Sequence, residues 1–124
     1  MFRFENLEIW KRSVDITDSI FDIADQLENK HCYRFADQLR GAVLSISNNI
    51  AEGSGSSSKK DFCQFLNYTH RSIFETVNML IIAYRRKYIQ DQQKDSLKNE
   101  LEEISKMVMR FSKSYQSKTL RSSL

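Results

Sequence analysis

The chain has 124 residues, a length that suits one folded domain. It contains no proline and only three glycines, and two of these, Gly53 and Gly55, lie in one short stretch. A sandwich or barrel of short strands needs turn residues every ~10 positions, so this composition excludes one. The net charge of +3, with a sequence pI near 8.9, permits a nucleic-acid partner without requiring one.

The cysteines and the apolar runs indicate where the protein resides. Cys32 and Cys63 lie far apart, and a disulfide-stabilised domain normally carries more cysteine, so we expect the reducing cytoplasm. Residues 1–5 lack the apolar core of a signal peptide. The longest apolar run, residues 79–84, is too short to cross a bilayer. We therefore expect a soluble cytoplasmic protein with no membrane partner.

Apolar residues recur at spacings of three and four along most of the chain, which is the period of an amphipathic helix. The pattern predicts four helices, at about residues 7–28, 33–52, 59–87 and 91–116. The connections between them are short, and the Gly/Ser-rich residues 53–58 are expected to form a loop between two helices. The fold class predicted is all-α: an antiparallel up-down-up-down four-helix bundle over residues 1–116, with a polar C-terminal tail over residues 117–124.

Particular residues are expected to begin and end these helices. Asn6 is a candidate N-cap for the first helix, and Asn29 is a candidate left-handed residue at its end. Gly53 is expected to end the second helix in the left-handed conformation, which glycine adopts without a steric penalty. Ser58 followed by Asp61 resembles a capping box and predicts the start of the third helix.

The third helix is predicted to be apolar on more than one side. At about 100° per residue, a second stripe lies beside its core-facing residues and consists of Cys63, Phe74, Ile81 and Tyr88. Met79 and Ile82 lie on yet another side. A helix that is apolar nearly all round must be covered on several faces, which favours an oligomer that packs through the third and first helices. Scattered apolar residues on the surface of a monomer are the alternative.

The sequence carries no motif that indicates catalysis or metal binding. A di-iron bundle needs two Glu-x-x-His motifs, and the chain does not contain two. A structural zinc site needs about four closely spaced Cys or His ligands, and no nucleophile elbow, phosphate loop or dinucleotide fingerprint is present. Cys63 and His70 lie roughly 10 Å apart along one helix, too far for direct contact. We therefore expect no enzyme, no catalytic residue, no metal and no cofactor.

A polar stripe runs along the predicted second helix, beside its apolar stripe. Its members are spaced seven, four and three residues apart and are Gln38, Ser45, Asn49 and Glu52. Buried polar groups must find partners, so we expect a hydrogen-bonded network with side chains chosen from Arg40, Arg71, Ser72 and Glu75. A solvated face is the alternative.

Two charged surfaces are predicted on other helices. One acidic stripe on the first helix consists of Asp15, Asp18, Asp22 and Asp25, and is either a solvated face or a surface for a protein partner. The basic candidates for nucleic-acid binding are Lys106, Arg110 and Lys113, followed by Lys118 and Arg121, together with Arg85, Arg86 and Lys87. A solvated basic face is the alternative reading of these cations.

The segment Gln38–Gly53 reads QLRGAVLSISNNIAEG and resembles the signature of the 23S rRNA intervening-sequence family, roughly Q-L-R-x-A-x-x-S-I-x-x-N-I-A-E-G. The opening Phe4–Trp10 and the blocks Phe62–Leu66 and Ser72–Glu75 are similar to other parts of that family. The resemblance covers about residues 2–112. It departs from the family pattern at Asn48, where a small residue is commoner, and at Arg71, where glycine precedes the Ser-x-x-Glu block.

The resemblance implies an antiparallel four-helix bundle assembled as a homopentameric ring. The residues that match recurring polar positions of the family are Ser45, Asn49, Glu52, Gly53, Ser72 and Glu75. The molecular function of the family is not established; its members are encoded within or near rRNA intervening sequences, and a similar fold serves as the nucleic-acid-binding accessory protein of diversity-generating retroelements. The function we expect is a non-enzymatic, homo-oligomeric scaffold that binds RNA or DNA. A protein–protein interaction ring with no nucleic-acid role is the alternative.

Overall fold

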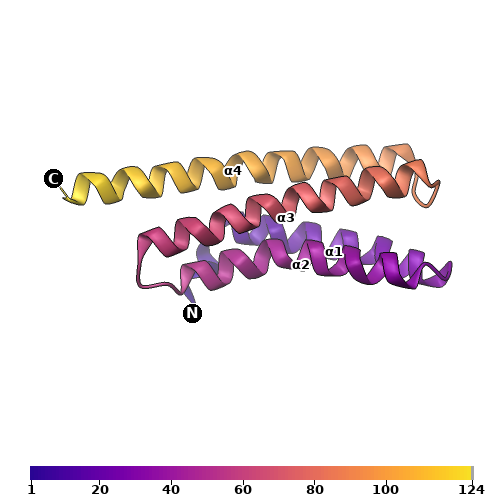
Figure 1. Ribbon diagram of the computed structural model, residues 1–124, viewed down its shortest axis with the longest axis horizontal. Coiled ribbons are helices and arrows are strands. Elements are labelled where there is room, and N and C mark those ends of the chain that lie inside the picture. The colour runs from indigo at the N-terminus through magenta and orange to yellow at the C-terminus, as the bar shows by residue number, and fades with distance from the viewer. Residues whose placement is uncertain (124) are drawn as a thin grey trace.

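The protein is a bundle of four long helices whose successive members run in opposite directions (Figure 1). The computed structural model describes the backbone of residues 1–123 and the side chains of residues 1–117. Within these residues there is no strand, and the elements are η1 (Arg3–Asn6), α1 (Glu8–Asn29), α2 (Tyr33–Ser54), α3 (Lys59–Arg85) and α4 (Asp91–Ser123). The predicted all-α, up-down-up-down four-helix bundle is confirmed.

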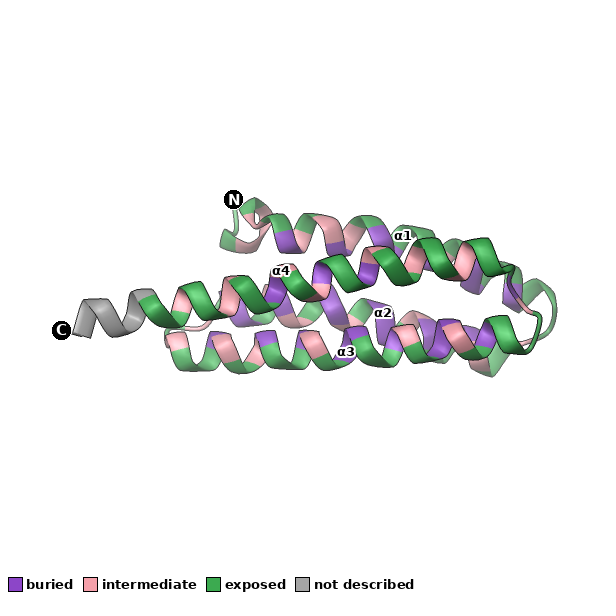
Figure 2. Ribbon diagram, turned by 90° about the horizontal axis from the view of Figure 1, so that it is seen from above, coloured by how far each residue is buried: buried purple, intermediate pink, exposed green. Residues whose placement is uncertain are grey.

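Each helix packs against the next one along the chain, and α1 also packs against α4, which closes the bundle. The apolar stripes of all four helices face inward, as the purple segments in Figure 2 show. The largest fully buried side chains include Ile20, Leu39, Ile46, Phe62, Leu80 and Ile104. Burial of these side chains against one another supplies the main stabilising free energy of the fold.

Small hydroxyl side chains lie within this apolar core and are all hydrogen-bonded. Thr69 of α3 donates to the carbonyl oxygen of Ile46 on α2, at 3.1 Å, while Thr76 donates within its own helix to the carbonyl of Ser72, at 2.8 Å. No buried side-chain nitrogen or oxygen among the described residues lacks a partner. The Thr69 bond therefore joins α2 to α3 without leaving a desolvated polar group.

The ends of the helices differ from the predictions in three places. The structure shows that Gly53 does not end α2, because the helix continues to Ser54 and no glycine has a positive φ angle. A Cβ atom on Gly53 would lie 2.6 Å from the Cβ of Phe65 on α3, so this close packing, and not a left-handed backbone, is the reason for glycine there. The predictions for Asn6 and Asn29 are also wrong, since Asn6 belongs to η1, and the left-handed residue after α1 is His31, with φ of 66°.

The start of α3 is as predicted. The side chain of Ser58 accepts a hydrogen bond from the backbone N–H of Asp61, at 3.1 Å. The other end of the bundle uses a left-handed residue after α3, Lys87, with φ of 63°. The helix α4 continues to Ser123, whereas a polar tail was expected from residue 117. The side chains of residues 118–124 lie outside the described residues, and these include the basic candidates Lys118 and Arg121.

Candidate functional site

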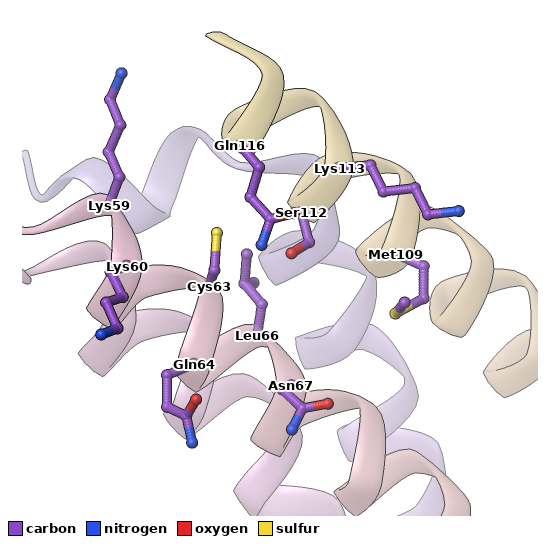
Figure 3. A pocket seen from close by; sticks show the side chains of 10 residues that line it. All are labelled: Lys59, Lys60, Cys63, Gln64, Leu66, Asn67, Met109, Ser112, Lys113 and Gln116. Carbon is purple, nitrogen blue, oxygen red and sulfur yellow. The ribbon is translucent and has the colours of Figure 1, made fainter. Parts of the chain in front are cut away.

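The antiparallel packing of α3 and α4 places the first turns of α3 beside the C-terminal half of α4. A groove of about 660 Å³ lies between the two helices there (Figure 3). The side chains of Cys63 and Leu66 from α3 meet those of Ser112 and Gln116 from α4 between the helices. The remaining lining residues are Lys59, Lys60, Gln64, Asn67, Met109 and Lys113. The groove therefore combines apolar, amide and cationic groups.

The charge along this groove is of one sign, because three lysines and no carboxylate line it. Lys60 and Lys113 make no ion pair with any described residue, and the Nζ atom of Lys59 lies 5.5 Å from the centroid of the Tyr115 ring. Asp61 is exposed nearby but does not line the groove. The positive end of the α3 dipole lies in the same first turn. The groove consequently carries a positive potential that attracts anions.

Some cations elsewhere on the protein are held by carboxylates. Arg12 of α1 contacts Glu100 of α4 at 2.7 Å, and Lys94 lies 2.8 Å from Asp91 and 3.0 Å from Asp95. The hydrogen bond to Asp91 raises the pKa of Lys94 above its ordinary value. These side chains neutralise one another locally, so they contribute less to an anion-attracting surface than the lysines of the groove do.

The structure divides the six basic residues singled out in the sequence into two groups. One group lies along one face of α4 and consists of Lys106, Arg110 and Lys113. Lys106 lies 3.9 Å from Glu102, and Arg110 lies 3.8 Å from Glu103. Only Lys113 of this group lines the groove. Arg85, Arg86 and Lys87 lie at the opposite end of α3, which is about 40 Å from Lys59 along the helix axis. The six residues therefore do not form one patch.

Two residues of the groove, Lys59 and Lys60, were not predicted from the sequence. They are adjacent and follow the serine-rich loop, so the charge itself was visible in the sequence. Their proximity to Lys113 arises from packing between helices, and the periodicity of a single helix does not contain it. In an antiparallel bundle the start of the third helix lies beside the end of the fourth, and this rule would have predicted that the two lysines lie near Lys113.

Apolar side chains remain exposed on the outer faces of α2 and α3. Phe74 is 63% exposed and Ile82 is 40% exposed, while Leu44 of α2 is 39% exposed. Met79, which the helical spacing placed on another outer side, is buried instead, and Tyr88 lies beyond the end of α3. The outer apolar surface is therefore smaller than the sequence suggested, and Phe74 is its most exposed member on α3.

The histidines and cysteines of the described residues form no cluster that could hold a metal ion. Glu28 and His31 do form one Glu-x-x-His sequence, but His31 lies beyond the end of α1 and contacts the Tyr33 hydroxyl at 2.7 Å. His70 lies 3.0 Å from the hydroxyl of Ser105, and this contact joins α3 to α4. Both cysteines are free thiols. None of the described helices has the length and apolar composition that crossing a bilayer requires.

The model of the 23S rRNA-intervening sequence protein family matches residues 5–110, which is most of the chain. The chain belongs to this family. A crystal structure of a protein of unknown function from the S23 ribosomal protein family of Bacteroides thetaiotaomicron is similar, with 26% sequence identity and a TM-score of 0.80. The similarity covers 85% of this chain and 98% of that chain. No curated protein matches the chain.

Part of the predicted polar stripe forms a connected set of hydrogen bonds. The amide of Asn49 donates to the carbonyl oxygen of Ser45 at 2.7 Å and to its hydroxyl at 3.0 Å. Ser72 of α3 donates to the Ser45 hydroxyl at 2.9 Å, which links α2 to α3. Glu75 and Arg71 line the same hollow, of about 450 Å³, without an ion pair between them. This set is half-buried, so its exposure lies between the two predicted alternatives, a buried network and a solvated face.

Other residues of the family signature lie apart from that set. Arg40 contacts Asp25 at 2.7 Å, Asp37 at 3.1 Å and Glu28 at 3.4 Å, and so joins α2 to α1. The hydrogen bond to Asp25 raises the pKa of Arg40 above its ordinary value. Gln38 and Glu52 are exposed, and neither has a hydrogen bond to a described residue. Since Asp25 is held by Arg40, the acidic stripe on α1 has three unpaired members: Asp15, Asp18 and Asp22.

Proposed function

We propose that this protein is a non-enzymatic scaffold, assembled from several copies, that binds RNA or other nucleic acid through basic side chains. The observation that carries this proposal is the groove between α3 and α4. Three lysines flank it, none of them makes an ion pair with a carboxylate of a described residue, and no acidic side chain lines it. Unpaired cations of this kind neutralise phosphates and release counterions from nucleic acid. The name of the family, which refers to an intervening sequence in 23S rRNA, agrees with RNA as the polymer.

Assembly is supported by the apolar side chains that the single chain leaves uncovered. Phe74 projects from α3 with 63% of its surface exposed, and Leu44 and Ile82 add to the apolar area on α2 and α3. Covering such side chains with a second copy removes apolar surface from water. The family resemblance implies a ring of five copies. A ring repeats each groove by symmetry, so one long RNA that reaches several grooves gains roughly 10²–10⁴-fold in apparent affinity.

The proposal includes the absence of catalysis. His70, the half-buried imidazole, contacts a serine hydroxyl, and no carboxylate among the described residues orients its ring. The groove itself offers lysines, amides and one thiol, which suit binding. Nucleic-acid binding accounts for these groups without any reaction step.

A second candidate function is a ring that gathers a protein partner. It is favoured by the acidic stripe on α1, where Asp15, Asp18 and Asp22 are exposed and make no ion pair with a described residue. A basic segment of another protein would complement this surface. The same stripe repels phosphate, so under the first function it would confine nucleic acid to the α3–α4 side of the bundle.

The two functions are separated by measuring binding to fluorescent RNA and duplex DNA over a range of salt concentrations. The proposed function predicts tight binding at low salt and a steep loss of affinity as salt rises. No binding to either polymer at low salt would contradict it and would favour the protein-partner ring.

A further inference from the structure

We infer that the groove between α3 and α4 takes an unpaired RNA strand, with a nucleobase seated between the two helices and the phosphates on the flanking lysines. This inference rests on the proposed function and specifies the form of nucleic acid that the site recognises. It draws on three features of the groove: its size, the chemistry of its walls and its distribution of charge.

The size of the groove suits one strand. Packed helices lie about 8–10 Å apart, and a side-chain-lined furrow between two of them cannot admit a double helix. Its volume of about 660 Å³ lies within the range of sites that enclose a small organic molecule. A nucleobase with its sugar is a group of that size, and in unpaired RNA the base is free to turn into such a site.

The chemistry of the walls suits a base. Leu66 forms a buried apolar floor, and the thioether of Met109, which is 38% exposed, lies on the α4 side. Methionine sulfur makes favourable contacts with aromatic rings. Asn67 and Gln116 face the groove from opposite helices, and neither has a hydrogen bond to a described residue. Each amide can donate and accept, as the edge of an unpaired base requires.

The charge lies at the edges of the groove, which is where a backbone would run. Lys59 and Lys60 extend from α3, and Lys113 extends from α4 on the other side (Figure 3). A strand whose base points inward carries its phosphates past these ammonium groups. Apolar and amide groups inside, with cations outside, are the arrangement expected of a single-strand binding groove.

Cys63 provides a direct test, because its thiol lies inside the groove. The other cysteine, Cys32, precedes α2 at the far end of the bundle and serves as an internal control in the same molecule. The native protein is alkylated with N-ethylmaleimide in the presence of an oligouridine or of the same strand annealed to oligoadenosine. The rate at each cysteine is read by mass spectrometry of the peptides, while fluorescence anisotropy reports binding.

With oligouridine at ten times its Kd, mass action predicts about a tenfold slower alkylation of Cys63 and an unchanged rate at Cys32. The duplex is expected to leave both rates unchanged. Bound oligouridine without protection of Cys63, or equal protection by the duplex, would overturn this inference while leaving nucleic-acid binding in place. If neither form binds at low salt, the proposed function fails as well.

A substitution that keeps the charge gives a second readout. Asn67→Leu removes a base-facing amide and is expected to weaken binding of the single strand by about 2–10-fold without changing the salt dependence. Asn78→Leu changes the same residue type at another exposed position of α3 and is expected to have no effect. Equal affinities for the two variants would contradict contact between Asn67 and a base.

Discussion

Gly53 and Phe65 bring α2 and α3 so close together that a Cβ atom on Gly53 would lie 2.6 Å from the Cβ of Phe65. The same Cβ would lie 2.9 Å from Cδ1 of Phe62. Both aromatic residues are in the first two turns of α3, directly after Lys59 and Lys60. The missing side chain at Gly53 thus positions the start of α3 and, with it, one edge of the lysine-lined groove.

This contact predicts opposite effects for the same substitution at two glycines of α2. Gly53→Ala is expected to lower the free energy of unfolding by about 1–2 kcal/mol, because the overpacking penalty exceeds the gain in helix propensity. A Cβ added at Gly41 would have no atom within 4 Å, so Gly41→Ala is expected to raise the free energy of unfolding by about 0.5–1 kcal/mol. Urea unfolding of both variants at one protein concentration measures the difference. A shift of the same sign for both would refute close packing at Gly53.

Lys87 predicts a stabilising change at the other end of the bundle. Its φ of 63° places a side chain in the left-handed region, where a Cβ is unfavourable. Lys87→Gly is expected to raise the free energy of unfolding by about 0.5–1 kcal/mol, after allowing for the greater freedom of glycine in the unfolded chain. Lys87→Ala keeps the Cβ and is the control, with no gain expected. Thermal unfolding in which glycine and alanine behave alike would exclude this explanation.

The polar stripe on α2 predicts unequal effects for two neighbouring family-signature residues. Asn49→Ala removes the bonds to Ser45 in a half-buried place, so we expect a loss of about 1 kcal/mol in the free energy of unfolding. Glu52 is exposed and has no partner among the described residues, so Glu52→Ala is expected to change the free energy of unfolding by less than about 0.5 kcal/mol. Chemical denaturation tests both variants, and a larger loss for Glu52→Ala would contradict this arrangement.

Self-assembly is tested at Phe74. Phe74→Glu places a charge on the most exposed apolar position of α3, and we expect it to break the assembly into smaller species, because burying an unpaired carboxylate is costly. Asn99→Glu, at an exposed polar position of α4, is the control. Size-exclusion chromatography with light scattering measures the mass. A wild-type protein that is monomeric at micromolar concentration would exclude the assembly.

The sequence was sufficient for the fold, because the 3.6-residue period is repeated through four long segments and few residues interrupt it. It was also sufficient for the Ser58 cap, since that bond forms within one turn. It failed at Gly53, where the reason for glycine is a phenylalanine on another helix. It also failed at His31, an exposed non-glycine residue that takes the left-handed conformation after α1.

The candidate site was only partly predictable for the same physical reason. Lys113 was found because it shares a helical face with other cations, but its neighbours Lys59 and Lys60 come from a different helix. Arg40 was expected to join the polar stripe, yet the carboxylates of α1 lie closer to it. In both cases the partner is set by how the helices pack, which the period of one helix does not specify.

The most direct test of nucleic-acid binding through the groove is the salt dependence of RNA affinity in two variants that remove equal charge. One is Lys59→Ser/Lys60→Ser/Lys113→Ser, and the control is Arg85→Ser/Arg86→Ser/Lys87→Ser at the far end of α3. For a single strand, losing three phosphate contacts reduces the slope of log Kd against log salt concentration by about 2. We predict that reduction, with weaker binding at low salt, for the groove variant and little change for the control. A slope that stays at the wild-type value in the groove variant, or falls equally in both, would contradict binding through the groove.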